Sequence, residues 1–200
     1  MNGLEKIIYN KVKNNPQLKQ RIVDMYQLIM SIFPQKPFIT TLPYYAREGY
    51  FYGFHDKSPF SPDGEKLLAH KNIIGNNLVK ANDEVEVGYF VGQNWTEFIH
   101  VDKSASWNWQ LGSMLQWCGK SNTKFAYNKL NRDKHVSIIY NIENSQSIEY
   151  DWPIVHISGD QKYACSYDFS RVEYAMPGYG YVSTHKEYTE YDSSFCVFNL

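Results

Sequence analysis

The sequence predicts a mainly β chain preceded by a short helical hairpin, and three observations lead to this prediction. Helical periodicity is confined to residues 4–33. After Pro43, short β-rich runs alternate with turn signals, and the absence of β–α alternation excludes a doubly wound parallel sheet. The chain has 200 residues, of which 43% are hydrophobic and 20% charged, a composition that excludes disordered chains, coiled coils and collagen-like fibres.

The N-terminal segment, residues 1–36, is predicted to form the helical hairpin. A first helix is indicated by apolar residues that share one face: Leu4, Ile7, Ile8 and Val12. The run NNP at residues 14–16 ends it and begins a second helix, because proline suits a first helical turn. This second helix has apolar residues three and four positions apart: Leu18, Ile22, Met25, Tyr26, Ile29 and Phe33. Prolines at 34 and 37 end the hairpin, whose apolar stripe needs a surface to bury it.

The second predicted domain, residues 37–200, is assigned short strands separated by turns. The candidate strands are 49–54, 66–71, 85–92, 96–101, 123–128, 135–142, 147–150, 154–157, 162–168, 179–183 and 194–199. Strands of this length and spacing are typical of an all-β sandwich, barrel or propeller.

An internal repeat selects the propeller from these three. Segments 60–71, 115–129 and 156–170 each contain a short strand, a polar turn with glycine, and a lysine followed by an apolar strand. The lysines are Lys66, Lys124 and Lys162, which are 58 and 38 residues apart. Their mean separation, about 48 residues, is typical of a four-stranded propeller blade with variable loops.

The first repeat, SPDG at 61–64 followed by KLLA at 66–69, resembles the blade turn of TolB-like β-propellers. The resemblance covers about residues 45–200. The second repeat departs from it, with WCGK at 117–120 in place of the motif. The resemblance implies about three blades, fewer than the roughly four of the smallest closed propellers. Either the chain is the N-terminal part of a six- to eight-bladed propeller, or the three units close in another way; we favour the first.

Candidate functional residues lie in loops that a propeller would direct toward its central channel. In segment 52–58, His55 offers a titratable imidazole, with Asp56 and Lys57 as possible ligand contacts. Successive strand residues point to opposite faces, so His55 and Asp56 can form a dyad only in a loop. The alternative role of His55 is to cap that loop.

Two further segments carry candidate ligand-binding residues. Trp107, Trp109 and Gln110 suit a sugar, because indoles stack on pyranose rings and amides bond to hydroxyls; the alternative is packing of the indoles between sheets. Arg171 could clamp a carboxylate or phosphate, or instead pair with Asp168. In the PGYGY run at 177–181, Tyr179 and Tyr181 would form either a binding loop or a connector.

These residues lead to a predicted function in carbohydrate binding or polysaccharide processing at the central channel. In its pattern of short strands and turns, the chain is similar to oligogalacturonate-lyase-type propellers. For an enzyme, this similarity implies a lyase or glycoside-active protein with a divalent metal, whose ligands the sequence does not fix. From their own chemistry, His55 and Arg171 are the residues that we expect to be catalytic. The alternative is a non-catalytic scaffold that binds protein through a propeller face and the basic N-terminal helices. Motifs of zincins, P-loop proteins, Rossmann enzymes and α/β-hydrolases are absent from the sequence.

The net charge, the absence of targeting signals and the cysteine spacing indicate which partners and which location to expect. The 20 Lys and Arg against 21 Asp and Glu give a net charge of −1, which argues against a dedicated nucleic-acid binder. No run is apolar and long enough to span a membrane, and the N-terminus has no signal-peptide pattern. The three cysteines lack metal-ligand spacing. We therefore expect reduced thiols, a cytoplasmic location, and an oligosaccharide, polysaccharide or protein as partner.

Overall fold

A computed structural model describes residues 16–33, 44–53, 57–183 and 195–200. The chain divides into two units, Met1–Tyr44 and Tyr45–Leu200, and each is described by itself. The first predicted helix lies outside the described residues.

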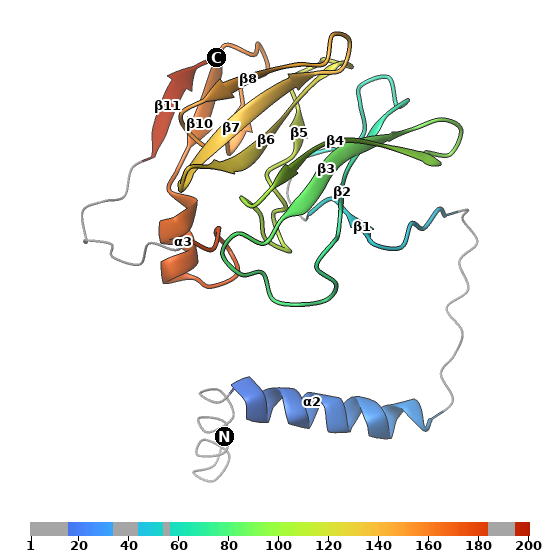
Figure 1. Cartoon of the computed structure of the whole chain (residues 1–200). Helices are drawn as coiled ribbons and strands as arrows, with labels where there is room; N and C mark the ends of the chain where they lie inside the picture. The colour runs from blue at the N-terminus through green and yellow to red at the C-terminus, as the bar shows by residue number, and fades with distance from the viewer. Residues whose placement is uncertain (1–15, 34–43, 54–56, 184–194) are drawn as a thin grey trace. The chain divides into compact units, whose positions relative to one another are not determined.

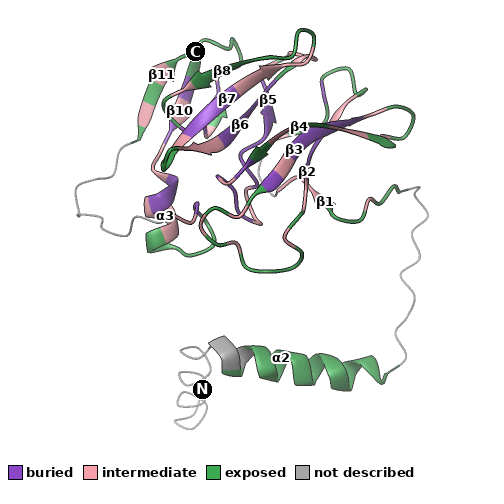
Figure 2. Cartoon of the chain, viewed as in Figure 1, coloured by how far each residue is buried: buried purple, intermediate pink, exposed green. Residues whose placement is uncertain are grey.

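The second predicted helix is confirmed as α2 (Pro16–Ser31), with Pro16 at its first position. Its large apolar side chains are exposed along the whole described length, from 37% for Val23 to 68% for Leu28 (Figure 2). Among the described residues, no helix has both the length and the apolar character that crossing a membrane requires.

The second unit is mainly β, as predicted, and contains three antiparallel sheets. The first joins β1 (Tyr50–Phe51), β2 (Leu67–Lys71), β3 (Val85–Val91) and β4 (Glu97–Ser104) in chain order. The second joins β5 (Gln116–Trp117), β6 (Lys124–Asn131), β7 (Lys134–Asn141) and β8 (Gln146–Tyr150) in the same way. The third comprises β9 (His156–Ile157), β10 (Tyr163–Ser166) and β11 (Cys196–Asn199). The sheets lie side by side, with helix α3 (Phe169–Ala175) at one end of the strands (Figure 1).

The middle sheet is buried on both faces. Successive residues of β6 point to opposite sides of this sheet, and each side belongs to a different hydrophobic core. Phe125 and Tyr127 belong to a core shared with Val87 of β3 in the first sheet. Ala126 belongs to a separate core with Ala164 of β10 in the third sheet. The middle sheet is therefore packed between its two neighbours.

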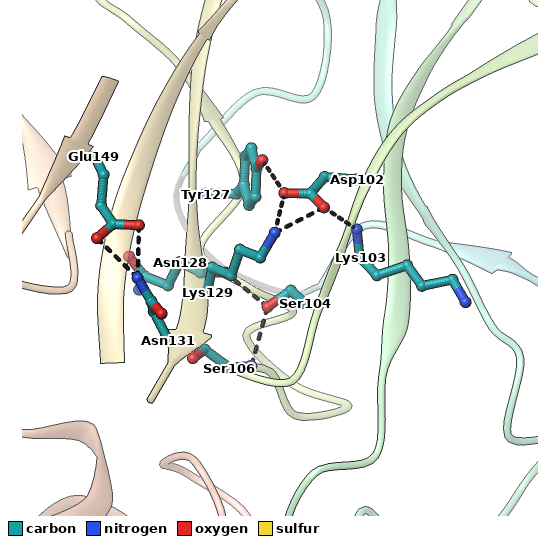
Figure 3. A network of polar contacts seen from close by, with 9 residues as sticks. All are labelled: Asp102, Lys103, Ser104, Ser106, Tyr127, Asn128, Lys129, Asn131 and Glu149. Atoms are coloured by element: carbon teal, nitrogen blue, oxygen red, sulfur yellow. Dashed lines mark hydrogen bonds and ion pairs between the residues drawn. The ribbon is translucent and has the colours of Figure 1, made fainter. Parts of the chain in front are cut away.

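Polar contacts reinforce the joint between the first and second sheets (Figure 3). The Asp102 carboxylate of β4 accepts hydrogen bonds from Tyr127 Oη at 2.7 Å and from Lys129 Nζ at 2.6 and 2.9 Å. Burial opposes ionisation of Asp102, but these hydrogen bonds outweigh it and lower its pKa.

A second polar joint is centred on Asn128, which is fully buried in β6. Its side chain accepts a hydrogen bond from Ile154 N at 2.7 Å and donates to Ile154 O at 3.0 Å. The same amide nitrogen donates to the Tyr181 hydroxyl at 3.0 Å. Asn128 thus fixes the segment that leads into β9 and the segment that follows α3.

The structure corrects three details of the predicted secondary structure. Residues 179–183 form no strand, because this segment crosses α3 and places Tyr181 flat on Phe169, with ring centroids 4.3 Å apart. Residues 169–175 are helical, since the Asp168 side chain caps the backbone N–H groups of Ser170 and Arg171. The two-residue strand β5 was absent from the strand prediction, although the repeat placed a short strand there.

Candidate functional site

Three turns, one in each sheet, lie immediately before the second strand of that sheet. In the first, Ser61 Oγ donates to the Asp63 carboxylate at 2.5 Å and Ser61 N donates to Lys66 O at 2.9 Å. In the third, Ser158 Oγ donates to Asp160 at 2.6 Å and Ser158 N donates to Tyr163 O at 2.8 Å. These two turns therefore repeat one hydrogen-bonding pattern. The pattern matches Lys66 with Tyr163, one residue beyond Lys162, with which the repeat alignment had paired it.

The aspartates of these turns are committed to local contacts. The Ser61 hydroxyl, and then a backbone N–H group, lowers the pKa of Asp63, and Ser158 acts in the same way on Asp160. Lys66 and Lys162 approach the two carboxylates at 3.9 and 3.8 Å. Both negative charges are therefore balanced within their own turns.

The second turn differs in sequence but contacts both of its neighbours. Cys118 N donates to Lys124 O at 3.0 Å, closing a longer loop. In this loop Asn122 Oδ1 accepts a hydrogen bond from Asp63 N at 3.0 Å. A Cβ on Gly119, whose φ is +54°, would lie 2.9 Å from Gly159 O. The three turns therefore meet at one place.

A pocket of about 620 Å³ opens where the turns meet, and we call it the turn pocket. All three sheets contribute to it, through strands β5 and β9 and through the segments beside the turns. It is lined by Lys57, Ser58, Phe60, Ser61, Pro62, Gln116, Trp117, Gly119, Lys120, His156, Ile157 and Gly159.

The turn pocket has a positive lining with two aromatic side chains. Lys57, Lys120 and His156 supply cationic or protonatable groups, and none of the described lining residues is Asp or Glu. Phe60 is 45% exposed, whereas Trp117 is 8% exposed and its indole N–H donates to Pro59 O at 2.9 Å. Such a lining can attract an anion and contact an apolar ring face.

The first predicted site segment contributes to this pocket. Lys57, a predicted ligand contact, is one of its lining residues. The predicted catalytic residue His55 and its neighbour Asp56 lie outside the described residues.

The second predicted segment is divided between the core and another pocket. Trp107 is fully buried, and its indole N–H donates to Asp83 O at 2.8 Å, so it offers no ring face to a ligand. Trp109 and Gln110 line a separate cavity of about 390 Å³, which we call the Trp109 pocket. Its other lining residues are Leu78, Val79, Asn108, Glu173, Pro177, Gly178 and Val182.

The third predicted segment contributes neither of its tyrosines to the two pockets. Tyr181 is fully buried against Phe169, and burial raises its pKa well above the ordinary value. Tyr179 is 44% exposed and lines neither pocket. Arg171 lies in the first turn of α3, where its backbone N–H donates to the Asp168 carboxylate at 3.1 Å. It does not line the turn pocket.

A Ser–His pair that sequence reasoning missed lies elsewhere in the unit. His135 Nδ1 is 2.6 Å from Ser106 Oγ, the separation of a nucleophile and its base. Ser106 is fully buried, however, and so cannot reach a substrate. Burial lowers the pKa of His135 to about 4, and Asp168 opposes this only in part. The pair therefore behaves as a neutral structural contact.

Metal and thiol chemistry receive no support from the part of the chain that the structure describes. Within those residues, no three His, Cys, Asp or Glu side chains gather as a metal site. All three cysteines are free thiols, and burial raises the pKa of Cys118 to about 12. A thiol with so high a pKa is a poor nucleophile.

Of the twelve turn-pocket residues, sequence reasoning named Lys57 alone as a ligand contact. Among those it missed are Gln116, Trp117, Lys120 and His156 of the second and third sheets. The signal that identifies them is the repeat itself. Each belongs to the strand or turn that precedes the second strand of its sheet. Lys57 and Phe60 lie in the corresponding segment of the first sheet, before β2.

Comparisons with known proteins add no further assignment. No protein-family model, no curated protein and no solved structure matches the chain.

Proposed function

We propose that the second unit consists of β-propeller blades and that the turn pocket binds an acidic carbohydrate. Three features support the blade interpretation: antiparallel strands in chain order, a two-residue first strand in each sheet, and a middle sheet packed on both faces. In this arrangement β1, β5 and β9 would be the innermost strands. The turn pocket, which β5 and β9 line, would then open beside the central channel.

The observation that carries the binding proposal is the chemistry of the turn-pocket lining. Segments from all three sheets place Lys57, Lys120 and His156 around a cavity with no described carboxylate on its wall. Lysine and histidine cations recognise carboxylates through charge-assisted hydrogen bonds. Phe60 supplies an exposed ring on which the C–H face of a pyranose can stack, and Gln116 and Ser58 supply polar groups for hydroxyls. A uronic acid oligomer combines these features.

The pocket also has a suitable size. Its volume, about 620 Å³, falls within the range of roughly 300–1,000 Å³ that is typical of small-molecule sites. The proposal concerns binding, and it assigns no reaction to the pocket.

The test is a calorimetric titration with trigalacturonic acid and with its neutral methyl ester. We expect the acid to bind at least about tenfold more tightly than the ester, a difference of about 1.4 kcal/mol. Lys57→Gln combined with Lys120→Gln should remove that preference, whereas the control Lys103→Gln, on β4 outside the pocket, should keep it. Equal binding of acid and ester, or binding of neither, would overturn the proposal.

A second candidate function, protein binding, is favoured by the exposed apolar face of α2. Amphipathic helices of this kind are usually covered by another apolar surface. We propose that a second copy of the chain covers this face, so that the protein self-associates through α2. Sedimentation velocity should show a dimer, and Ile22→Lys with Ile29→Lys should give a monomer; a wild-type chain that stays monomeric at all concentrations would contradict this candidate.

A further inference from the structure

The Trp109 pocket has the opposite charge character to the turn pocket. Glu173 is the one charged side chain among its described lining residues, and Leu78, Val79 and Val182 make much of the remaining wall apolar. The acidic group and the apolar wall together define the class of ligand that the pocket could accept.

The carboxylate of Glu173 is held in place by the loop that follows α3. Its Oε2 atom accepts hydrogen bonds from Gly178 N at 2.8 Å and Gly180 N at 3.1 Å. The loop lies against the helix so closely that a Cβ on Gly180 would collide with Phe169 O and Glu173 N. Glu173 is thus a positioned acceptor in the pocket wall rather than a mobile surface side chain.

The side-chain donors of Asn108 and Trp109 are already used. The Asn108 amide nitrogen donates to Gly180 O at 2.6 Å, and its oxygen accepts from Gln110 N and Leu111 N at 2.9 and 2.7 Å. The Trp109 indole N–H donates to Asn77 O at 2.8 Å. In contrast, the buried Oε1 atom of Gln110 has no hydrogen-bond partner. A buried acceptor without a partner is unfavourable, so a ligand that brings donors gains a hydrogen bond when the Gln110 amide turns toward it.

We propose that the Trp109 pocket binds an organic ammonium group attached to an apolar body. An ammonium supplies N–H donors for Gln110 Oε1 and the Glu173 carboxylate, and its positive charge is attracted to both Glu173 and the face of Trp109. The apolar body would occupy the wall of Leu78, Val79 and Val182. This site shares no lining residue with the turn pocket, and the inference does not depend on the proposed function.

The test uses n-butylammonium and its neutral counterpart n-butanol as probes. Binding is followed through the indole N–H signal of Trp109 in ¹⁵N-labelled protein, assigned with Trp109→Phe. We expect butylammonium to bind at least about tenfold more tightly than butanol. Glu173→Gln, which keeps an acceptor oxygen for Gly178 and Gly180, should abolish the preference. The control Glu149→Gln lies on β8, outside the pocket, and should leave it unchanged.

Two results would overturn the proposal: equal binding of the two probes, or an unchanged preference in Glu173→Gln. If Glu173→Gln does not fold, Gln110→Leu decides in its place. That variant removes the unpaired acceptor and should weaken butylammonium binding severalfold. It should weaken butanol binding less, because a hydroxyl donates only one uncharged hydrogen bond. An unaltered affinity for butylammonium would then refute the site.

Discussion

The turn pocket and the Trp109 pocket are built by one unit, yet their linings are chemically opposite. The first gathers Lys57, Lys120 and His156 from segments of three sheets, whereas the second holds Glu173 as its one charged described residue. The chain as a whole has a net charge of −1. A net charge near zero can therefore conceal local surfaces of positive and of negative charge, because the turns and helix α3 place their charged side chains in separate pockets.

The largest expected loss of stability comes from removing the Asn128 side chain, whose hydrogen bonds hold segments beside both pockets. Asn128 fixes Ile154, which precedes β9 of the turn pocket, and Tyr181, which follows the loop of the Trp109 pocket. Asn128→Ala leaves several buried polar groups unpaired and should lower the free energy of unfolding by about 4 kcal/mol. Asn131→Ala, whose partner Glu149 is exposed, should lower it by less than about 0.5 kcal/mol. Denaturant unfolding measures both, and similar losses would show that Asn128 has no such role.

Acid should weaken the unit through His135, without a direct effect on either pocket. Its folded pKa of about 4 lies below the ordinary value of 6.5, so the folded state resists protonation. Stability from this group is therefore complete above pH 6.5 and falls as the pH drops toward 4, by about 3 kcal/mol at most. Unfolding of wild type and His135→Gln between pH 7 and pH 4 checks this. A pH profile that is equally steep in the variant would exclude His135 as the cause.

Two glycines, one beside each pocket, should respond differently to an added methyl group. Gly180→Ala meets backbone atoms of Phe169 and Glu173 and should lower the free energy of unfolding by about 2 kcal/mol. Gly159→Ala, in the turn pocket, meets nothing within 4 Å and should change it by less than about 0.5 kcal/mol. Gly180→Ala should also weaken butylammonium binding, because the loop that holds Glu173 must move. Equal thermal shifts for the two variants would contradict the close packing of this loop.

The smallest expected effect on stability comes from a charge reversal in the turn pocket, which should separate the ligand preferences of the two pockets. Lys120 is exposed, so Lys120→Glu should leave thermal stability nearly unchanged. It should reduce trigalacturonate affinity at least about tenfold, about 1.4 kcal/mol, and leave butylammonium affinity unaltered. Calorimetry with both ligands measures this, and a change in butylammonium affinity would show that the pockets are coupled.

Local patterns in the sequence predicted most of the secondary structure. Alternating residues such as those of β6 identify a strand, and the spacing of Leu18 and Ile22 identifies α2, because both signals come from neighbouring residues. Helix α3 was missed although Asp168 is a typical N-cap and the PG pair at 177–178 follows its end. A seven-residue helix has too few turns for its periodicity to stand out.

The site was harder to predict, because it depends on contacts between distant segments. Lys57 was identified, but Lys120 and His156 join it through the meeting of three turns, which local patterns do not reveal. Trp107 and Tyr181 were chosen for their chemistry, and their complete burial depends on packing with residues far away in the chain. The repeat alignment already held the missing information, since it identified the three turns as equivalent positions.

The most direct test of the turn pocket as an acidic-carbohydrate site uses the tryptophans as reporters. Trp117 lines the turn pocket and Trp109 lines the other, so the indole N–H signal of each tryptophan reports on its own pocket. Both signals can be followed in one ¹⁵N-labelled sample during a titration with trigalacturonic acid, with assignments from Trp117→Phe and Trp109→Phe. We predict a saturable shift of the Trp117 signal and none of the Trp109 signal. A shift confined to Trp109, or no shift at all, would contradict the central claim.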